Sequence, residues 1–267
     1  DIPVNDMVKM KSLIYTLNFW TKKYDEGKPV VSDKEYDKKY FELAELEKKT
    51  GCVLSKSPTA NIPYEVKNEL KKVKHNHPML SLAKTKDIEE VKKFMGDKEP
   101  CILMAKMDGL TCSLTYEKGK LVKAETRGNG KIGEDITHNI YNVKEVPLHL
   151  ASDIDMIVDG EIICTYVDFK PFSSQYKNPR NFAAGSIRLL DSKESGSRNL
   201  TFVAWDLIKG DIKTNKLSSN LIKLEEYGFF IVPWGMCDRN SLKDQIDFIA
   251  DNISNKYPID GCVIKFN

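Results

Sequence analysis

Cys101-Ile102-Leu103-Met104-Ala105-Lys106-Met107-Asp108-Gly109 is the stretch of sequence that indicates the fold. The apolar run over residues 101–105 predicts a buried strand that carries Lys106 at its end. Gly109 is expected to let the backbone approach a ligand closely before a second strand begins at Thr111. An ammonium is not nucleophilic, but burial and neighbouring cations lower the pKa of a lysine amine. Lys106 is therefore the candidate nucleophile.

Strand patterns continue after Gly109. Residues 111–117 and 120–126 flank Lys118-Gly119, which is typical of a two-residue hairpin turn. Further apolar runs predict strands at residues 157–164, 200–206 and 259–266.

Helical spacing of apolar residues predicts helices before and between these strands. Ser32 and Glu35 form a capping-box pattern, and Gly51 is the expected end of the helix that Ser32 opens. Other helices are expected at residues 6–25, 217–227 and 241–252, and one opened by Asn181. Residues 1–55 are thus a small helical unit, and the polar, lysine-rich residues 57–75 are expected to connect it to the strands.

Composition limits the class of protein. The 267 residues carry a net charge of +2, so contacts with nucleic acid must come from local patches of lysine. The six cysteines form no close pairs, which disfavours a zinc site or a disulfide framework, and no metal ligands are assigned. No apolar run is long enough for a membrane span, and the first residues do not resemble a signal peptide. We expect a cytoplasmic protein that does not contact a membrane.

Seven groups of residues follow one another in a distinctive order. They are Asp33-Lys34-Glu35-Tyr36-Asp37, His77-Pro78-Met79-Leu80-Ser81-Leu82, Lys106-Met107-Asp108-Gly109, Thr126-Arg127-Gly128-Asn129-Gly130 with Gly133-Glu134-Asp135-Ile136-Thr137, Asp159-Gly160-Glu161, Asn178-Pro179-Arg180-Asn181 with Arg188, and Ile259-Asp260-Gly261-Cys262-Val263-Ile264-Lys265. This series closely resembles the NAD-dependent DNA ligases of bacteria and their phages, from about residue 12 to the last residue.

The resemblance implies an α+β fold with two parts. Residues 1–70 would form a small helical subdomain that binds the nicotinamide nucleotide. Residues 71–267 would form an antiparallel-sheet nucleotidyltransferase (adenylation) domain that is incomplete at its C-terminus. The implied activity uses NAD and Mg²⁺ in DNA replication and repair. Lys106 attacks the adenylyl phosphorus of NAD, nicotinamide mononucleotide leaves, and AMP then passes to the 5′-phosphate of nicked double-stranded DNA.

The same resemblance implies roles for individual side chains. Asp108 would assist catalysis by orienting Lys106 or a metal-bound water, although an aspartate before glycine is also an ordinary turn residue. Glu161 would bind the ribose, and a carboxylate in an apolar strand needs a partner in any case. Arg127 would contact the nucleotide, and Lys265 would reach the adenylate unless it simply faces solvent.

The resemblance also implies binding roles for the remaining residues, and for some of them a purely structural role is the alternative. Arg180 and Arg188 would grip phosphates, yet exposed helix arginines are common. Trp205 stands where the family has an aromatic near adenine, and a core tryptophan is the alternative. Asp33, Tyr36 and Asp37 share one helix face, which would bind the nicotinamide nucleotide. Ser81 and Leu82 would lie beside the dinucleotide.

Some positions depart from the family pattern. Met104 replaces the usual glutamate that contacts adenine, Lys23-Tyr24 replaces an aromatic pair, and Asn252 replaces an arginine. The family's later lysine motif and its oligonucleotide-binding, zinc, helix-hairpin-helix and BRCT regions do not follow Lys265. We therefore expect the missing ligase domains to act in cis or as a separate polypeptide.

Two other functions remain open. An ATP-using ligase or capping-type nucleotidyltransferase shares Lys-x-Asp-Gly, but the acidic helix and Ser81-Leu82 argue against it. A non-catalytic nucleic-acid-binding relative is disfavoured because Lys106, Glu161 and Lys265 are all retained.

Overall fold

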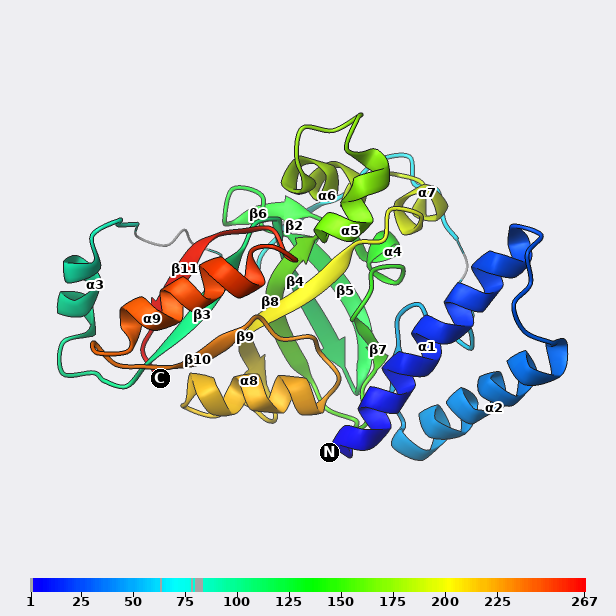
Figure 1. The fold of residues 1–267 in the computed structure, drawn as a ribbon, viewed down its shortest axis with the longest axis horizontal. Helices are drawn as coiled ribbons and strands as arrows, with labels where there is room; N and C mark the ends of the chain where they lie inside the picture. The colour runs from blue at the N-terminus through cyan, green and yellow to red at the C-terminus, as the bar shows by residue number, and fades with distance from the viewer. Residues whose placement is uncertain (1, 63, 78, 80–83) are drawn as a thin grey trace.

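The N-terminal part of the protein is a pair of long helices. The structure, a computed structural model, describes residues 2–62, 64–77, 79 and 84–267. Helices α1 (Val4–Asp25) and α2 (Asp33–Thr50) form a hairpin at one end of the molecule (Figure 1). They share a hydrophobic core that includes Met10, Leu17 and Leu43 and is distinct from the main core. Both helices agree with the predicted ranges.

Local sequence explains where α2 begins and ends. The Ser32 side chain accepts a hydrogen bond from the Glu35 backbone N–H at 3.2 Å, as an N-cap does. Gly51 adopts a left-handed conformation with φ of 73°, which glycine tolerates, and its N–H donates to Glu47. The N-cap at Ser32 and the glycine stop are thus correct predictions.

A six-stranded antiparallel sheet forms the centre of the molecule. Its strand order is β1-β7-β5-β4-β8-β9. The bounds are β1 (Val53–Leu54), β7 (Pro147–His149), β5 (Lys120–Thr126), β4 (Leu110–Glu117), β8 (Met156–Ile163) and β9 (Thr201–Gly210). Lys118 and Gly119 join β4 to β5 with φ values of 48° and 77°, so the predicted two-residue hairpin is present.

A second antiparallel sheet of three strands carries the opening motif. It contains β10 (Trp234–Cys237), β3 (Cys101–Met107) and β11 (Ile259–Lys265), with β3 in the middle. Two short strands, β2 (Lys72–Lys74) and β6 (Ile132–Glu134), pair separately. Residues 57–75 were expected only to connect two domains. Within them, however, β2 pairs with β6 and Val66 forms a β-bridge with Asp191, so the segment is also part of the β-structure.

The turn at Gly109 joins the two sheets. A Cβ atom at this position would lie 2.1 Å from the backbone oxygen of Ile162 in β8. The close approach that requires glycine is therefore between β4 and β8. The packing of the two strands therefore explains this glycine, whereas the sequence had suggested that it makes room for a ligand.

Shorter helices surround the sheets (Figure 1). They are α3 (Ile88–Met95), α4 (Thr137–Ile140), α5 (Tyr166–Phe169) with the 3₁₀ turn η1 (Lys170–Phe172), α6 (Pro179–Ile187), α7 (Ser192–Gly196), α8 (Leu217–Glu226) and α9 (Leu242–Phe248), which continues as the π-helical turn η2 (Ile249–Ile253). The helices predicted at 217–227 and 241–252 are confirmed. Helix α6 begins at Pro179 rather than Asn181, because the Asn178 side chain caps the Asn181 N–H at 2.8 Å.

The main hydrophobic core lies between the sheets and these helices. Tyr116, Phe182, Phe202 and Phe229 are its largest fully buried side chains. The predicted α+β class, with antiparallel sheets and a helical N-terminal portion, is confirmed.

Candidate active site

Lys106 faces an acid from a distant part of the chain. Strand β3 pairs with β11, and Lys106 stands opposite Gly261. The register shifts between Ile259 and Gly261, so Asp260 is an extra residue in a β-bulge, a device that re-aims side chains. The Lys106 Nζ lies 3.1 Å and 3.2 Å from the two carboxylate oxygens of Asp260. About a third of each side chain is exposed, so the lysine remains accessible to a ligand.

Asp108 and Arg180 lie beside this pair. The Arg180 Nε is 3.6 Å from Asp108 Oδ1, with Arg180 more exposed than Asp108. Burial raises the pKa of Asp108, the charge of Asp260 adds to the increase, and Arg180 and Lys106 oppose it. The structure thus places two carboxylates and two cations around the end of β3.

Glu161 has the partner that its position in an apolar strand requires. Thr111 on β4 stands opposite Glu161 on β8, and Thr111 Oγ1 donates a hydrogen bond of 2.8 Å to Glu161 Oε1. Burial raises the Glu161 pKa to about 7, although hydrogen bonding from Thr111 and the charge of Lys106 lower it. This carboxyl is therefore poised to change charge near neutral pH.

Trp205 and Lys265 pack against each other at the same site. The Lys265 Nζ lies 4.5 Å from the centre of the Trp205 ring, a cation–π contact. Burial lowers the pKa of Lys265, while Asp206 and Asp159 oppose the decrease. Lys265 is partly buried, so the alternative of a simply solvent-facing lysine is wrong.

Arg127 holds a neighbouring segment in place. Its Nε donates to the backbone oxygen of Met79 at 2.9 Å, and its own carbonyl oxygen lies 2.7 Å from His75 Nε2. The glycine-rich loop after it is a tight turn between β5 and β6. A Cβ atom at Gly133 would lie 1.7 Å from Thr126 O, so backbone packing explains this glycine.

Arg188 is engaged by an acid of the protein itself. Its Nε and Nη2 donate to the two oxygens of Glu134 at 2.7 Å and 3.3 Å. Lys72 lies 3.7 Å from the same carboxylate. A phosphate would have to compete with Glu134 for this guanidinium.

The acidic face of α2 is in a different part of the structure. Tyr36 stacks on Tyr40 with a centroid distance of 6.4 Å and belongs to the core of the helical hairpin. Within the described residues, no hydrogen bond or ion pair joins Asp33, Tyr36 or Asp37 to the Lys106 site. The structure does not bring this face and Lys106 together. Ser81 and Leu82 lie outside the described residues.

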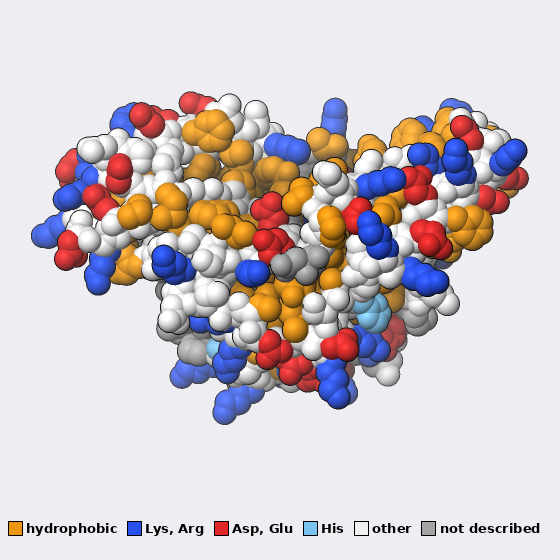
Figure 2. All heavy atoms as spheres, turned by 90° about the horizontal axis from the view of Figure 1, so that it is seen from below, with side chains coloured by type: hydrophobic (Ala, Val, Ile, Leu, Met, Phe, Trp, Pro, Cys, Tyr) orange, Lys and Arg blue, Asp and Glu red, His pale blue; other side chains and the backbone are white. Residues whose placement is uncertain are grey.

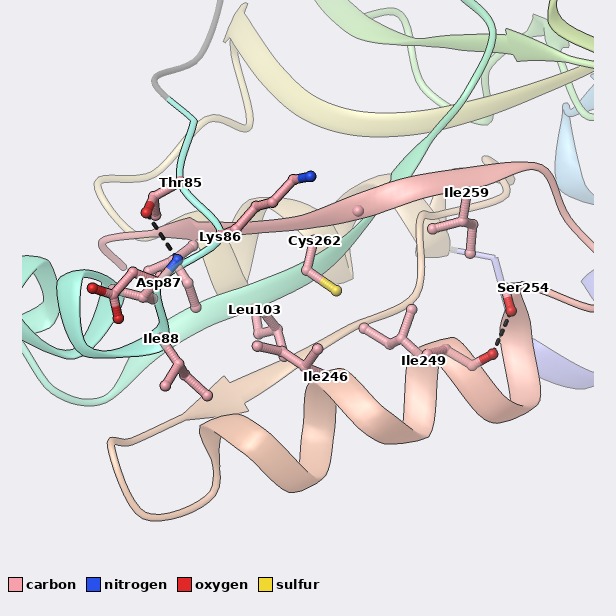
Figure 3. A pocket seen from close by; sticks show the side chains of 14 residues that line it. Thr85, Lys86, Asp87, Ile88, Leu103, Ile246, Ile249, Ser254, Ile259 and Cys262 are labelled. Carbon is pink, nitrogen blue, oxygen red and sulfur yellow. Dashed lines mark hydrogen bonds between the residues drawn. The ribbon is translucent and has the colours of Figure 1, made fainter.

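A cavity of about 430 Å³ lies on the opposite face of the three-stranded sheet (Figure 3). Leu103 and Cys262 face it, together with Ile246 of α9 and Ile249 of η2. Side chains alternate along a strand, so Leu103 and Lys106 point to opposite faces of β3. The cavity is largely apolar, and Lys106, Glu161 and Lys265 are not among the residues that line it.

Charges of both signs are mixed on the surface (Figure 2), and the described residues form no cluster of metal ligands. Basic and acidic side chains are interspersed on the face shown in Figure 2. Over residues 2–62, 64–77, 79 and 84–267, no group of three or more His, Cys, Asp or Glu side chains is arranged to hold a metal. No described helix is long and apolar enough to cross a membrane.

The sequence analysis predicted most of the residues of this site, but not all of them. Lys106, Asp108, Arg180, Glu161, Trp205 and Lys265 form one connected site. Asp260 and Thr111 were quoted within motifs or strands without a role. The position of Asp260 in the bulge next to Lys106, and of Thr111 opposite Glu161, became visible only with the register of the strands.

Comparisons with known proteins show which family the chain resembles. The family model described as NAD-dependent DNA ligase adenylation domain matches residues 67–267. The DNA ligases of Ruminiclostridium cellulolyticum and Lachnoclostridium phytofermentans are each 40% identical over 91% of this chain and 38% of their own length. The DNA ligase of Clostridium tetani is 38% identical over 100% of this chain and 44% of its own length. A solved structure of mycobacterial DNA ligase D complexed with ATP and MES aligns with a TM-score of 0.35 and 12% identity, over 62% of this chain and 48% of that chain.

Proposed function

The chain belongs to the NAD-dependent DNA ligase adenylation domain family, and on this premise we propose that Lys106 is the residue that becomes adenylated. The observation that carries the proposal is the position of Lys106 at the end of a buried strand, with its amine exposed and next to Asp260. An exposed amine beside an acid can both lose a proton and meet a phosphate.

The proposed step is an in-line displacement at the adenylyl phosphorus of NAD. The Lys106 amine forms a bond to phosphorus, and the bond between this phosphorus and the oxygen of nicotinamide mononucleotide breaks. Asp260 accepts the proton that the Lys106 ammonium must lose, since its oxygens lie 3.1 Å and 3.2 Å from Nζ. The products are the lysyl-AMP phosphoramidate and nicotinamide mononucleotide.

The surrounding side chains fit the AMP half of the dinucleotide. Glu161 would accept hydrogen bonds from the ribose hydroxyls and is held in place by Thr111. Lys265 and Arg180 would balance the negative charge of the phosphates. Trp205 would offer a ring near adenine, and Arg127 would contact the nucleotide. Met104 lies on the same strand as Lys106 but has no polar atom that could replace the usual glutamate.

Magnesium fits this site only together with the phosphates. Asp108 and Asp260 are two carboxylates near the Lys106 amine, and Mg²⁺ is commonly held by one or two carboxylates, waters and substrate phosphates. Asp108, with the phosphates and waters, would therefore hold the ion, which would spread the negative charge of the phosphates, while Asp260 faces the Lys106 amine.

The helical hairpin would bind the other half of NAD. Asp33, Tyr36 and Asp37 present two carboxylates and a ring on α2, and we assign them to the nicotinamide nucleotide, with Ser81 and Leu82 beside the dinucleotide. Because this face lies apart from Lys106, the hairpin would have to move toward the adenylation site when NAD binds.

Transfer of AMP to DNA would need more protein than this chain. The chain spans about two fifths of the length of the curated relatives that it matches. Nicked double-stranded DNA is the proposed substrate of the complete ligase, and the remaining region would act in cis or as a separate polypeptide. Arg188 would contribute to phosphate binding only after release from Glu134.

The proposal is tested by mass spectrometry of the intact protein. The purified chain is incubated with magnesium and either NAD or ATP. We expect NAD alone to add one adenylyl group, on Lys106, and Lys106→Ala to remove it without changing the thermal midpoint of unfolding. An adduct from ATP but not NAD, or an adduct on another lysine, would overturn the proposal.

A further inference from the structure

A β-bulge at Trp205 turns an additional acid toward the site. In the β8/β9 pair, Asp159 stands opposite Asp206 and Gly160 stands opposite Ala204. Trp205 is therefore the extra residue of the bulge. Without the bulge, Trp205 and Asp206 would point to opposite faces of the sheet because side chains alternate. The bulge instead places Asp206 on the face that carries Asp159 and Glu161, next to the ring that Lys265 covers.

Asp159 and Asp206 form the middle of a row of charged and polar groups. Like charges directly opposite each other on paired strands are destabilising, so each carboxylate needs compensation. His77 Nε2 lies 2.8 Å from Asp159 Oδ2 on one side of the row. On the other side, Lys265 is the cation that most lowers the pKa of Asp206, with a smaller effect from Lys213. Burial raises the pKa of both carboxyls.

Lys265 in turn needs a counter-ion. Its side chain is partly buried and its ammonium lies over the Trp205 ring, and no carboxylate of the described residues forms a salt bridge with it within 4.0 Å. Taking an ammonium out of water costs free energy unless acidic groups compensate. Asp206 is the acid whose charge acts most strongly on Lys265, ahead of Asp159.

We propose that Asp206 is a positioning residue for Lys265: its carboxylate, aimed by the bulge at Trp205, holds the Lys265 ammonium over the indole ring at the point where it meets the adenylate. The last clause rests on the proposed function, whereas the charge interaction between Asp206 and Lys265 does not. Asp206 itself would touch neither NAD nor AMP.

Lysine labelling tests the charge interaction between Asp206 and Lys265 without any enzymatic activity. The whole chain is treated with a small amount of acetic anhydride at pH 8, and acetylation of Lys265 is measured by peptide mass spectrometry relative to the exposed Lys118. Loss of the counter-ion in Asp206→Asn lowers the Lys265 pKa and frees the amine, so we expect its acetylation to rise about threefold or more. Asp206→Glu keeps the charge and should label as the unmodified chain does. Asp251→Asn, an exposed acid far along the chain, is the matched control.

A double-mutant cycle tests the positioning role. The rate of adenylation by NAD is compared in Asp206→Asn, Lys265→Met and the double variant. We expect Asp206→Asn to slow adenylation roughly tenfold in the presence of Lys265 and to have little effect in its absence, because residues that act through each other are not additive. The thermal midpoint of each variant verifies folding, and Asp206→Ser replaces Asp206→Asn if the latter does not fold.

The outcomes separate this inference from the proposed function. Unchanged acetylation of Lys265 in Asp206→Asn, or equal rate losses with and without Lys265, would overturn the positioning role. Failure of the unmodified chain to form any AMP adduct would count against the proposed function, and the labelling result would still decide whether Asp206 holds Lys265.

Discussion

Lys106 and Asp260 are 154 positions apart in the sequence, yet the Lys106 Nζ lies 3.1 Å from Asp260 Oδ2. The pairing of β3 with β11 brings the two residues together, and the bulge at Asp260 turns the carboxylate to the lysine. A second bulge, at Trp205, places Asp206 opposite Asp159 on the face of the sheet that also carries Glu161. Two local irregularities in the strands therefore decide which charged side chains face the site.

Asp260→Asn should slow adenylation because the Lys106 ammonium loses its proton acceptor. We expect about a hundredfold lower rate, the lower end of the effect of a general base. Single-turnover formation of the AMP adduct measures it, with Asp251→Asn as the control for a neutralised surface acid. An unchanged rate in Asp260→Asn would exclude proton acceptance by this residue.

Tyr36→Ala or Asp37→Ala should impair the reaction with NAD more than the later steps. The face of α2 is separate from the Lys106 site, and a lost stacking contact is worth about tenfold in nucleotide binding. The comparison is made in the full-length ligase, between adenylation by NAD and sealing of nicked DNA by preformed enzyme–AMP. Glu45→Ala, exposed on the same helix, is the control. Equal losses in both steps would contradict the assignment.

Glu161→Gln should change the pH dependence of stability. The pKa of Glu161 in the folded protein is about 7, above the ordinary 4.5, because of burial. Its contribution to stability is present at low pH and is lost as the pH rises from about 4.5 to about 7, since the unfolded chain releases the proton first. The difference in unfolding free energy between Glu161→Gln and the unmodified chain should therefore shift in favour of the variant by up to about 3 kcal/mol from pH 4.5 to pH 8. Urea unfolding at both pH values measures this, and Glu117→Gln on the exposed end of β4 should show no such difference.

Gly109→Ala should destabilise the protein. The added Cβ would meet Ile162 O at 2.1 Å and Ile163 Cγ2 at 2.9 Å, and the first of these is backbone. We expect a loss of at least about 2 kcal/mol in unfolding free energy. Gly185→Ala is the matched control, because Gly185 lies in α6 with nothing within 4 Å of the added atom, and alanine favours a helix. Similar stability of both variants would show that β4 and β8 can separate without cost.

The 267-residue chain by itself should bind NAD and adenylate slowly, and it should not seal nicked DNA. A net charge of +2 leaves little attraction for the phosphates of a duplex. A gel assay of a nicked duplex, with and without the remaining ligase region supplied separately, measures sealing. Efficient sealing by this chain alone would refute the expectation.

Local patterns were sufficient to predict most helices and strands. The capping box at Ser32, the glycine at position 51 and the hairpin at Lys118-Gly119 act over a few residues, so the sequence shows them directly. The start of α6 was misplaced because Asn178 and Pro179 are also common turn residues. Helix α3 and the short strands β2, β6, β7 and β10 were not predicted, because a few residues carry too weak a pattern.

The sequence by itself determined the chemistry that is available: a lysine at the end of an apolar strand, a glutamate inside another, and a lysine near the last residue. Only the tertiary structure decided which charges meet. Pairing of distant strands and the bulges at Asp260 and Trp205 depend on contacts between residues far apart in the chain, and a shift of one residue in register would turn these side chains to the other face. Such long-range register is not encoded in any local pattern, and it places Asp260 beside Lys106 and Asp206 opposite Asp159.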